Sequence, residues 1–138
     1  MQCRWLLILA CGVLTGCGSR SPFEYEKVSG KVIYDDGSKI PANVMELRFQ
    51  ALDAPKVENA FPRPGMAIVN GDGEFECVTS YKFGDGLIPG RHKVSIELGI
   101  GPNKKPLVPN EYMSISTTPL EVNTADTPLE IRVPKPKG

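Results

Sequence analysis

The stretch His92-Lys-Val-Ser-Ile-Glu-Leu98 decides the fold class, because apolar and polar side chains alternate along it without a break. Its apolar positions are Val94, Ile96 and Leu98, and its polar positions are Lys93, Ser95 and Glu97. A period of two residues turns one set of side chains toward a core and the other toward solvent, as in a half-buried β-strand. The stretch therefore predicts an antiparallel sheet with one covered face.

Other runs with the same alternation occur along the rest of the chain. They are Val28–Tyr34, Val44–Ala51, Met66–Val69, Glu74–Thr79, Tyr112–Thr117, Leu120–Val122 and Leu129–Val133. Thirteen prolines and fourteen glycines punctuate the chain, and Asn70-Gly71-Asp72-Gly73 is a strong hairpin signal because positive φ costs little at Asn, Asp and Gly. No window of about ten residues has the apolar period of a helix. We expect an all-β domain at residues 26–134, a seven-or-so-stranded antiparallel Greek-key β-sandwich of prealbumin-like or immunoglobulin-like type.

The first seventeen residues indicate an export signal. Arg4 precedes an apolar run of about ten residues, which is too short for a membrane-spanning helix of roughly twenty. The run ends in Leu14-Thr15-Gly16-Cys17, which resembles the bacterial lipobox, where the cysteine thiol receives a diacylglycerol and the chain is cut before it. The resemblance implies a lipoprotein signal peptide at residues 1–16 and lipid attachment at Cys17. An ordinary cleaved signal is one alternative, and Ile8-Leu9-Ala10-Cys11 is another, which leaves an apolar run of only about six residues.

Lipidation at Cys17 would leave 122 residues, enough for one domain with a single core. We expect a lipid-anchored tether at residues 17–25 and a polar tail at 135–138. Gly18 rather than Asp after the cysteine implies a cell-envelope protein of the outer membrane, under the sorting rule of well-studied bacteria. Without Arg4, fifteen basic residues remain against sixteen acidic ones, so nucleic acid is not an expected partner and the membrane is reached through the lipid.

The same cut determines which thiols remain. Cys3 and Cys11 leave with the signal and Cys17 carries the lipid, so Cys77 is the one free thiol expected in the mature chain. Alternation with Phe75 puts Cys77 on an apolar face, where we expect a small buried hydrophobe. An intermolecular disulfide and a catalytic thiol are the weaker alternatives.

Three motifs occur in an order that resembles one family. They are Val28-Ser-Gly-Lys-Val-Ile-Tyr34-Asp-Asp-Gly37, Asn70-Gly-Asp-Gly-Glu-Phe75, and Gly84-Asp-Gly86 leading to Pro89-Gly90-Arg-His-Lys-Val94. The chain is similar to the small envelope lipoproteins, abundant in planctomycete-type bacteria, that carry a carboxypeptidase-regulatory-like or transthyretin-like domain. Ser38-Lys39-Ile40-Pro41 departs slightly from the family pattern after its glycine. The resemblance implies a non-catalytic module with no assigned ligand, and we expect no cofactor.

Residues suited to catalysis or metal binding are few. His92 is the only histidine, and it has the parity of the apolar face, so we expect a structural residue rather than a general base. One histidine and one free cysteine do not complete a zinc site. The least implausible metal is calcium, with Asp72 and Glu74 as weak candidates beside Asp35-Asp36, although hairpin turns alone account for these residues.

Two function classes therefore remain. The first is a non-catalytic module that binds an envelope protein or saccharide through its long loops, Asp53–Gly65 and Gly99–Asn110. Phe61, Arg63 and Tyr112 are the candidate anchors there, and the alternative is that they only pack against the sandwich. The second is a lipid-anchored, carbohydrate-active or other hydrolase that uses turn carboxylates, either Asp85 or Asp72 with Glu74.

Overall fold

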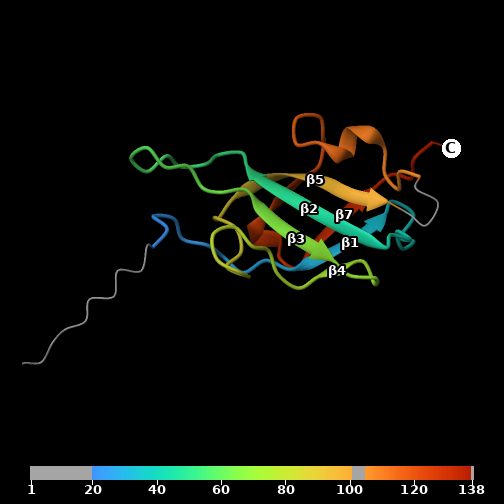
Figure 1. Ribbon diagram of the computed structural model, residues 1–138, viewed down its shortest axis with the longest axis horizontal. Coiled ribbons are helices and arrows are strands. Elements are labelled where there is room, and N and C mark those ends of the chain that lie inside the picture. The colour runs from blue at the N-terminus through green and yellow to red at the C-terminus, as the bar shows by residue number, and fades with distance from the viewer. Residues whose placement is uncertain (1–19, 101–104, 138) are drawn as a thin grey trace, which may run out of the picture.

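The computed structural model describes residues 20–100 and 105–137, with the backbone alone at 98–100. Within these ranges seven strands form two sheets (Figure 1). The strands are β1 Gly30–Tyr34, β2 Val44–Ala51, β3 Gly65–Val69, β4 Glu74–Phe75, β5 Arg91–Ile100, β6 Glu121–Asn123 and β7 Leu129–Val133, and the 3-10 helices are η1 Asn110–Met113 and η2 Thr124–Asp126. The expected signal segment 1–16, Cys17, Gly18 and the side chain of Leu98 lie outside the described residues.

The two sheets form two layers around one core. Their strand orders are β4-β1-β7 and β3-β2-β5-β6. Apolar side chains at every second position face inward, so β3 and β7 alternate between buried and exposed residues along their whole length. The rings of Phe49 on β2 and Phe75 on β4 lie 6.0 Å apart and join the layers. The expectation of an all-β domain is therefore confirmed at the level of two sheets that share a core.

The expectation that every strand pair is antiparallel is wrong at one pair. β1 and β7 run parallel, with Gly30 opposite Leu129 and Tyr34 opposite Val133. Alternation predicts which side chains face the core but carries no information about the direction of the neighbouring strand. Direction is fixed by the turn in a hairpin, whereas β1 and β7 are separated by most of the domain and have no such constraint.

The segment Tyr112–Thr117 is not the strand that its alternation predicts. It begins inside η1, where the Tyr112 amide donates to the carbonyl of Pro109 at 3.0 Å. It then turns at Ser114, whose carbonyl accepts from the amide of Thr118 at 2.9 Å and whose hydroxyl pairs with that of Ser116 at 2.9 Å. Serine and threonine offer the backbone local hydrogen bonds that compete with a sheet ladder. The segment packs along β5 instead.

The strand expected at Glu74–Thr79 ends after two residues. β4 stops at Phe75, and the chain next joins a sheet at Thr79, which bridges to Met66. The alternation is lost between these points, so Val78 is fully buried while Cys77, a free cysteine, is only half-buried. The prediction of a buried Cys77 is therefore wrong, because the chain leaves the pleat as it crosses between the sheets.

Candidate functional site

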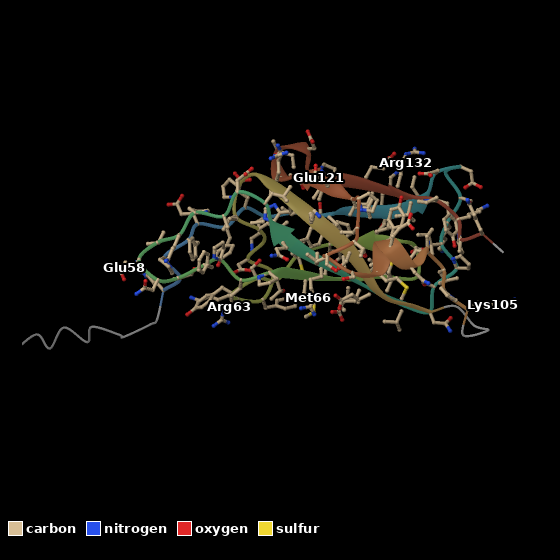
Figure 2. All side chains as sticks on the ribbon, turned by 90° about the horizontal axis from the view of Figure 1, so that it is seen from above. Glu58, Arg63, Met66, Lys105, Glu121 and Arg132 are labelled. Carbon is tan, nitrogen blue, oxygen red and sulfur yellow. The ribbon has the colours of Figure 1, made fainter. Side chains whose placement is uncertain are left out.

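The two long loops predicted to contact a partner leave from opposite ends of the larger sheet. β2 and β5 are antiparallel, with Ala51 opposite His92 at one end and Val44 opposite Ile100 at the other. The loop after β2 therefore leaves from one end, and the segment after β5 leaves from the other. Figure 2 shows the consequence, with Arg63 and Lys105 far apart along the long axis. Phe61 and Arg63 thus do not share a site with Tyr112.

We call the first of these ends the tether end and define it as residues 20–27, 53–64 and 80–87. The guanidinium of Arg63 lies 4.9 Å from the ring centre of Tyr81, and Lys56 Nζ lies 5.6 Å from that of Phe61. Glu26 and Leu87 form a two-residue bridge, with N–H···O distances of 2.7 and 3.0 Å. The start of the described chain is thereby joined to the loop at 80–87, whose Tyr81 contacts the candidate anchor Arg63. These segments lie at the same end of the molecule (Figure 1).

Asp85 organises the loop at 80–85. Its Oδ1 accepts from the amide of Ser80 at 2.8 Å, and its Oδ2 accepts from the amides of Tyr81 and Lys82 at 3.0 and 2.8 Å. Partial burial opposes ionisation of this carboxyl, but the three amide donors outweigh it and hold the pKa of Asp85 below its ordinary value of 3.8. Both oxygens are engaged in shaping the loop, so Asp85 is a turn residue in this structure.

Asp85→Asn is expected to lower the free energy of unfolding at pH 7 by about 1–3 kcal/mol, because one amide donor would then face an NH2 group. The folded-state pKa is depressed, so the contribution of the carboxylate is complete above pH 3.8 and is lost as the pH falls through the lower folded value. Urea denaturation at pH 7 and at pH 3 measures both effects. Asp72→Asn, at an exposed ion pair with Lys39, is the control and should stay within about 0.5 kcal/mol. Equal losses for the two variants would contradict the role of Asp85.

The other predicted anchor, Tyr112, is half-buried and packs against the core. Burial raises the pKa of its phenol, and the negative charges of Glu111 and Asp35 raise it further. At the end of β1, the Tyr34 hydroxyl donates to the carbonyl of Leu107 at 2.9 Å. We call this region, residues 35–43 and 105–113, the far end.

The weak calcium candidates belong to a hairpin turn. The Asn70 side-chain oxygen accepts from the amides of Asp72 and Glu74 at 2.9 and 3.0 Å, and Asp72 pairs with Lys39 at 3.3 Å. At the neighbouring turn the Asp36 carboxylate lies 2.6 Å from Lys135. Within residues 20–100 and 105–137, no three His, Cys, Asp or Glu side chains are grouped as metal ligands.

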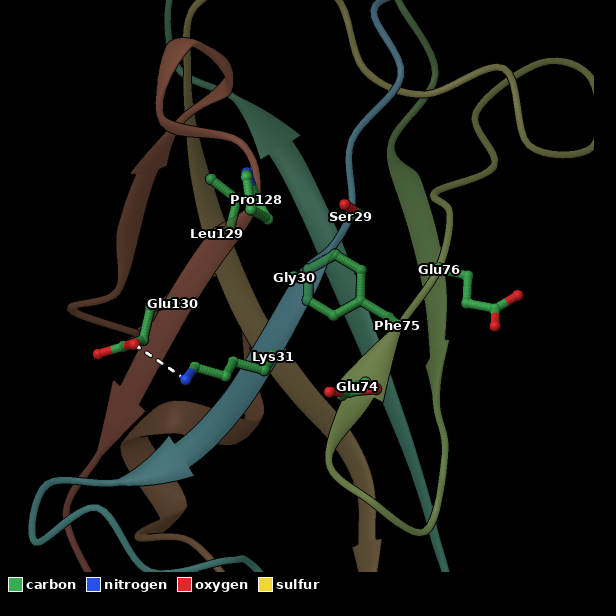
Figure 3. A pocket seen from close by; sticks show the side chains of 9 residues that line it. All are labelled: Ser29, Gly30, Lys31, Glu74, Phe75, Glu76, Pro128, Leu129 and Glu130. Atoms are coloured by element: carbon green, nitrogen blue, oxygen red, sulfur yellow. Dashed lines mark ion pairs between the residues drawn. The ribbon is translucent and has the colours of Figure 1, made fainter.

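A shallow depression of about 530 Å³ lies over the smaller sheet (Figure 3). Three glutamates line it, but Glu130 and Glu76 lie on opposite sides of Phe75. Glu130 bonds Arg132 at 2.7 Å and Lys31 at 3.2 Å, and both cations hold its pKa below the usual range. The surface is acidic, yet its carboxylates do not converge. This surface was not predicted from the sequence, although Glu74 on β4 and Glu130 on β7 occupy outward positions of their strands.

An apolar groove of about 460 Å³ runs along the outer edge of β3. It is lined by Met66 and Ile68 on the solvent face of β3, and by Cys77 and Phe83 across from them. This groove was not predicted from the sequence either. The signal was present, because β3 carries apolar side chains at both of its outward positions, where a half-buried strand usually carries polar ones.

His92 is buried at the start of β5, as its parity predicts. Burial lowers the pKa of its imidazole, and a 3.2 Å contact between Nδ1 and the carbonyl of Gly90 partly opposes this. The ring therefore lies at the edge of the core and is closed off from solvent.

No model of a protein family, no curated protein and no solved structure matches this chain. In the part of the chain that the structure describes, no helix has the length and apolar character needed to cross a membrane. Functional assignment therefore rests on the chain's own residues and their arrangement.

Proposed function

We propose that this chain is a non-catalytic, lipid-anchored protein of the bacterial cell envelope, attached to the outer membrane through a diacylglycerol on Cys17. The observation that carries the proposal is the lipobox-like Leu14-Thr15-Gly16-Cys17, which follows a short apolar run and precedes the β domain in the sequence. Each buried methylene of an acyl chain contributes about 0.8 kcal/mol, so two or more chains hold a protein of this size stably at a bilayer.

The domain that the lipid would hold is, in this proposal, a Greek-key sandwich of the carboxypeptidase-regulatory-like or transthyretin-like type. Its two-sheet all-β architecture agrees with that assignment. An envelope protein or saccharide is the proposed partner, contacted from the far end, where Tyr112 offers an aromatic ring on η1. The far end and the tether end are at opposite ends of the larger sheet.

The non-catalytic assignment is supported by the engagement of the candidate catalytic groups. The carboxylate of Asp85 is occupied by three backbone amides, and His92 is buried at the edge of the core. Glycoside hydrolysis needs two carboxyl groups facing one another across a sugar, about 5–10 Å apart in a cleft. Asp72 and Glu74 lie on an exposed turn, and no observation favours the hydrolase alternative.

The test is metabolic labelling with palmitate in a bacterium that lipidates its own envelope proteins. The wild-type chain is expected to take up label, and Cys17→Ala is expected to lose it, because the thiol is the site of thioether formation. Cys11→Ala and Cys77→Ala are matched controls and should keep the label. Label that survives Cys17→Ala would overturn the proposal, and label lost with Cys11→Ala alone would move the anchor to the other lipobox-like stretch.

A further inference from the structure

We propose that the tether end is a membrane-docking surface, which brings Phe61 and Phe83 into the interfacial layer of the bilayer that holds the lipid anchor. The inference rests on the proposed lipidation of Cys17 and adds an orientation to it. The occupant is the lipid surface itself, contacted through apolar and aromatic side chains.

The first argument for membrane docking is the length of the tether. Three Cα–Cα steps separate Cys17 from Arg20, so even a fully extended chain spans only about 11 Å. The expected tether at residues 17–25 is too long at its C-terminal end, because residues 21–25 pack on the domain. Ser21, Phe23 and Tyr25 are half-buried and line a depression of about 300 Å³ together with Tyr81, Lys82 and Asp85.

The bridge between Glu26 and Leu87 then fixes this segment to the rest of the tether end. A bilayer extends about 5–8 Å beyond its hydrocarbon core on each side, as headgroups. A domain tied to a lipidated cysteine by about 11 Å of chain is therefore held with its tether end at the headgroups.

The second argument is that aromatic side chains are exposed at the tether end. Phe83 is 90% exposed and Phe61 is 64% exposed, although both are large and apolar. The contact between Arg63 and Tyr81 joins the two loops, and each phenylalanine lies two residues from one member of that pair. Phe83 also borders the apolar groove beside Met66, which is itself exposed. Such a gathering of exposed apolar side chains marks an interaction surface.

The cations beside these rings suit the headgroup level of a bilayer. Lys56 lies over Phe61, and Arg63 lies over Tyr81. Aromatic rings and long cationic side chains are the residues that settle at a membrane interface, with their apolar parts inward and their charges in the headgroups.

The balance of charges at the tether end determines whether anionic or zwitterionic lipid is favoured. Its basic residues are Arg20, Lys27, Lys56, Arg63 and Lys82, and its acidic residues are Glu24, Glu26, Asp53, Glu58 and Asp85. Because the two sets balance, anionic lipid gains little from this surface. Docking is therefore expected on zwitterionic phosphatidylcholine and should be insensitive to salt.

The experiment uses the lipidated mature protein reconstituted into phosphatidylcholine vesicles with brominated acyl chains, which quench nearby tryptophan. The single tryptophan of the sequence, Trp5, leaves with the signal, so Phe61→Trp and Phe83→Trp each introduce one reporter. Val44→Trp is the matched control, since Val44 is an exposed apolar residue (53%) at the opposite end of β2, roughly 23 Å away along the strand.

Reporters at positions 61 and 83 are expected to shift to shorter emission wavelengths and to lose at least half of their fluorescence to the brominated lipid. The reporter at position 44 should lose less than a tenth. Quenching equal to that at Val44 would overturn the docking surface, as would quenching that requires phosphatidylglycerol or disappears in 0.5 M salt.

Mass spectrometry of the N-terminal peptide from the same vesicles separates the two proposals. A diacylglyceryl group on Cys17 together with unquenched reporters would leave the lipid anchor standing and refute the docking surface. An N-terminal peptide without lipid would refute the anchor, and the docking surface with it.

Discussion

Gly86→Ala is expected to lower the free energy of unfolding by about 3–5 kcal/mol, a large share of what a domain of this size has. Gly86 has φ near +102°, a conformation that L residues rarely adopt. A Cβ there would overlap the carbonyl oxygen of Glu26, lie 2.5 Å from its carbonyl carbon and lie 3.1 Å from Lys27 Cα. All three are backbone atoms, so no side-chain rotation relieves the overlap. The bridge between Glu26 and Leu87 would have to open.

Substitutions at two other glycines separate the two causes of this loss, which are backbone strain at positive φ and steric overlap of the new Cβ. Gly90 has φ near +122° but open space around its Cα, so Gly90→Ala should cost only the backbone strain, about 1–2 kcal/mol. Gly71 has open space and no positive φ, and Gly71→Ala should stay within about 0.5 kcal/mol. Urea denaturation of the three variants measures their free energies of unfolding and so ranks the three losses. If Gly86→Ala were no worse than Gly90→Ala, the close approach of residue 26 would be wrong, and with it the fixed position of the tether end.

The strands that could be predicted from sequence are those with one face on the core. Val44–Ala51 and Leu129–Val133 begin and end where their alternation predicts, and Met45, Leu47 and Phe49 are buried as expected. In such a strand one face packs on the core, and this determines both the alternation of apolar residues and their burial. The alternation in a single sequence is therefore enough to predict which residues are buried. The parity of His92 predicted its burial for the same reason.

What the sequence did not predict depends on residues that are distant along the chain. The parallel pairing of β1 with β7 and the short β4 follow from how the chain crosses between sheets. The relative position of the two long candidate loops could not be predicted for a related reason. Only the long-range register, Ala51 opposite His92 and Val44 opposite Ile100, reveals that the two long loops leave from opposite ends.

The same holds for individual candidates. Phe61 and Arg63 were selected because they are an aromatic and a cation in a long loop, and their chemistry was visible in the sequence. Phe83 was missed, because nothing in its own loop indicates that it stands beside the loop of Phe61. The sequence thus indicated residue types suited to an interface, while the fold supplied the surface on which they gather.

Phe75→Ala is expected to cost about 3–5 kcal/mol and to leave the domain partly unfolded at room temperature. Phe75 is one of only two residues in β4, is 2% exposed, and places its ring 6.0 Å from that of Phe49 in the other sheet. Its loss removes a large buried ring and leaves a cavity between the layers, with little strand beside it to collapse inward. Phe75→Leu, which keeps most of the volume, should cost about 1–2 kcal/mol.

Phe83→Ala is the matched control, since the same side chain is deleted eight residues later at a position that is 90% exposed. It should change the free energy of unfolding in solution by less than about 0.5 kcal/mol. A double-mutant cycle with Phe49→Ala should give about 0.5–1.5 kcal/mol of coupling to Phe75, because an aromatic pair contributes beyond the area that it buries. A Phe75→Ala variant as stable as Phe83→Ala would contradict the core position of Phe75. The same result would also show that the contact between Phe75 and Phe49 does not hold the short β4 against the larger sheet.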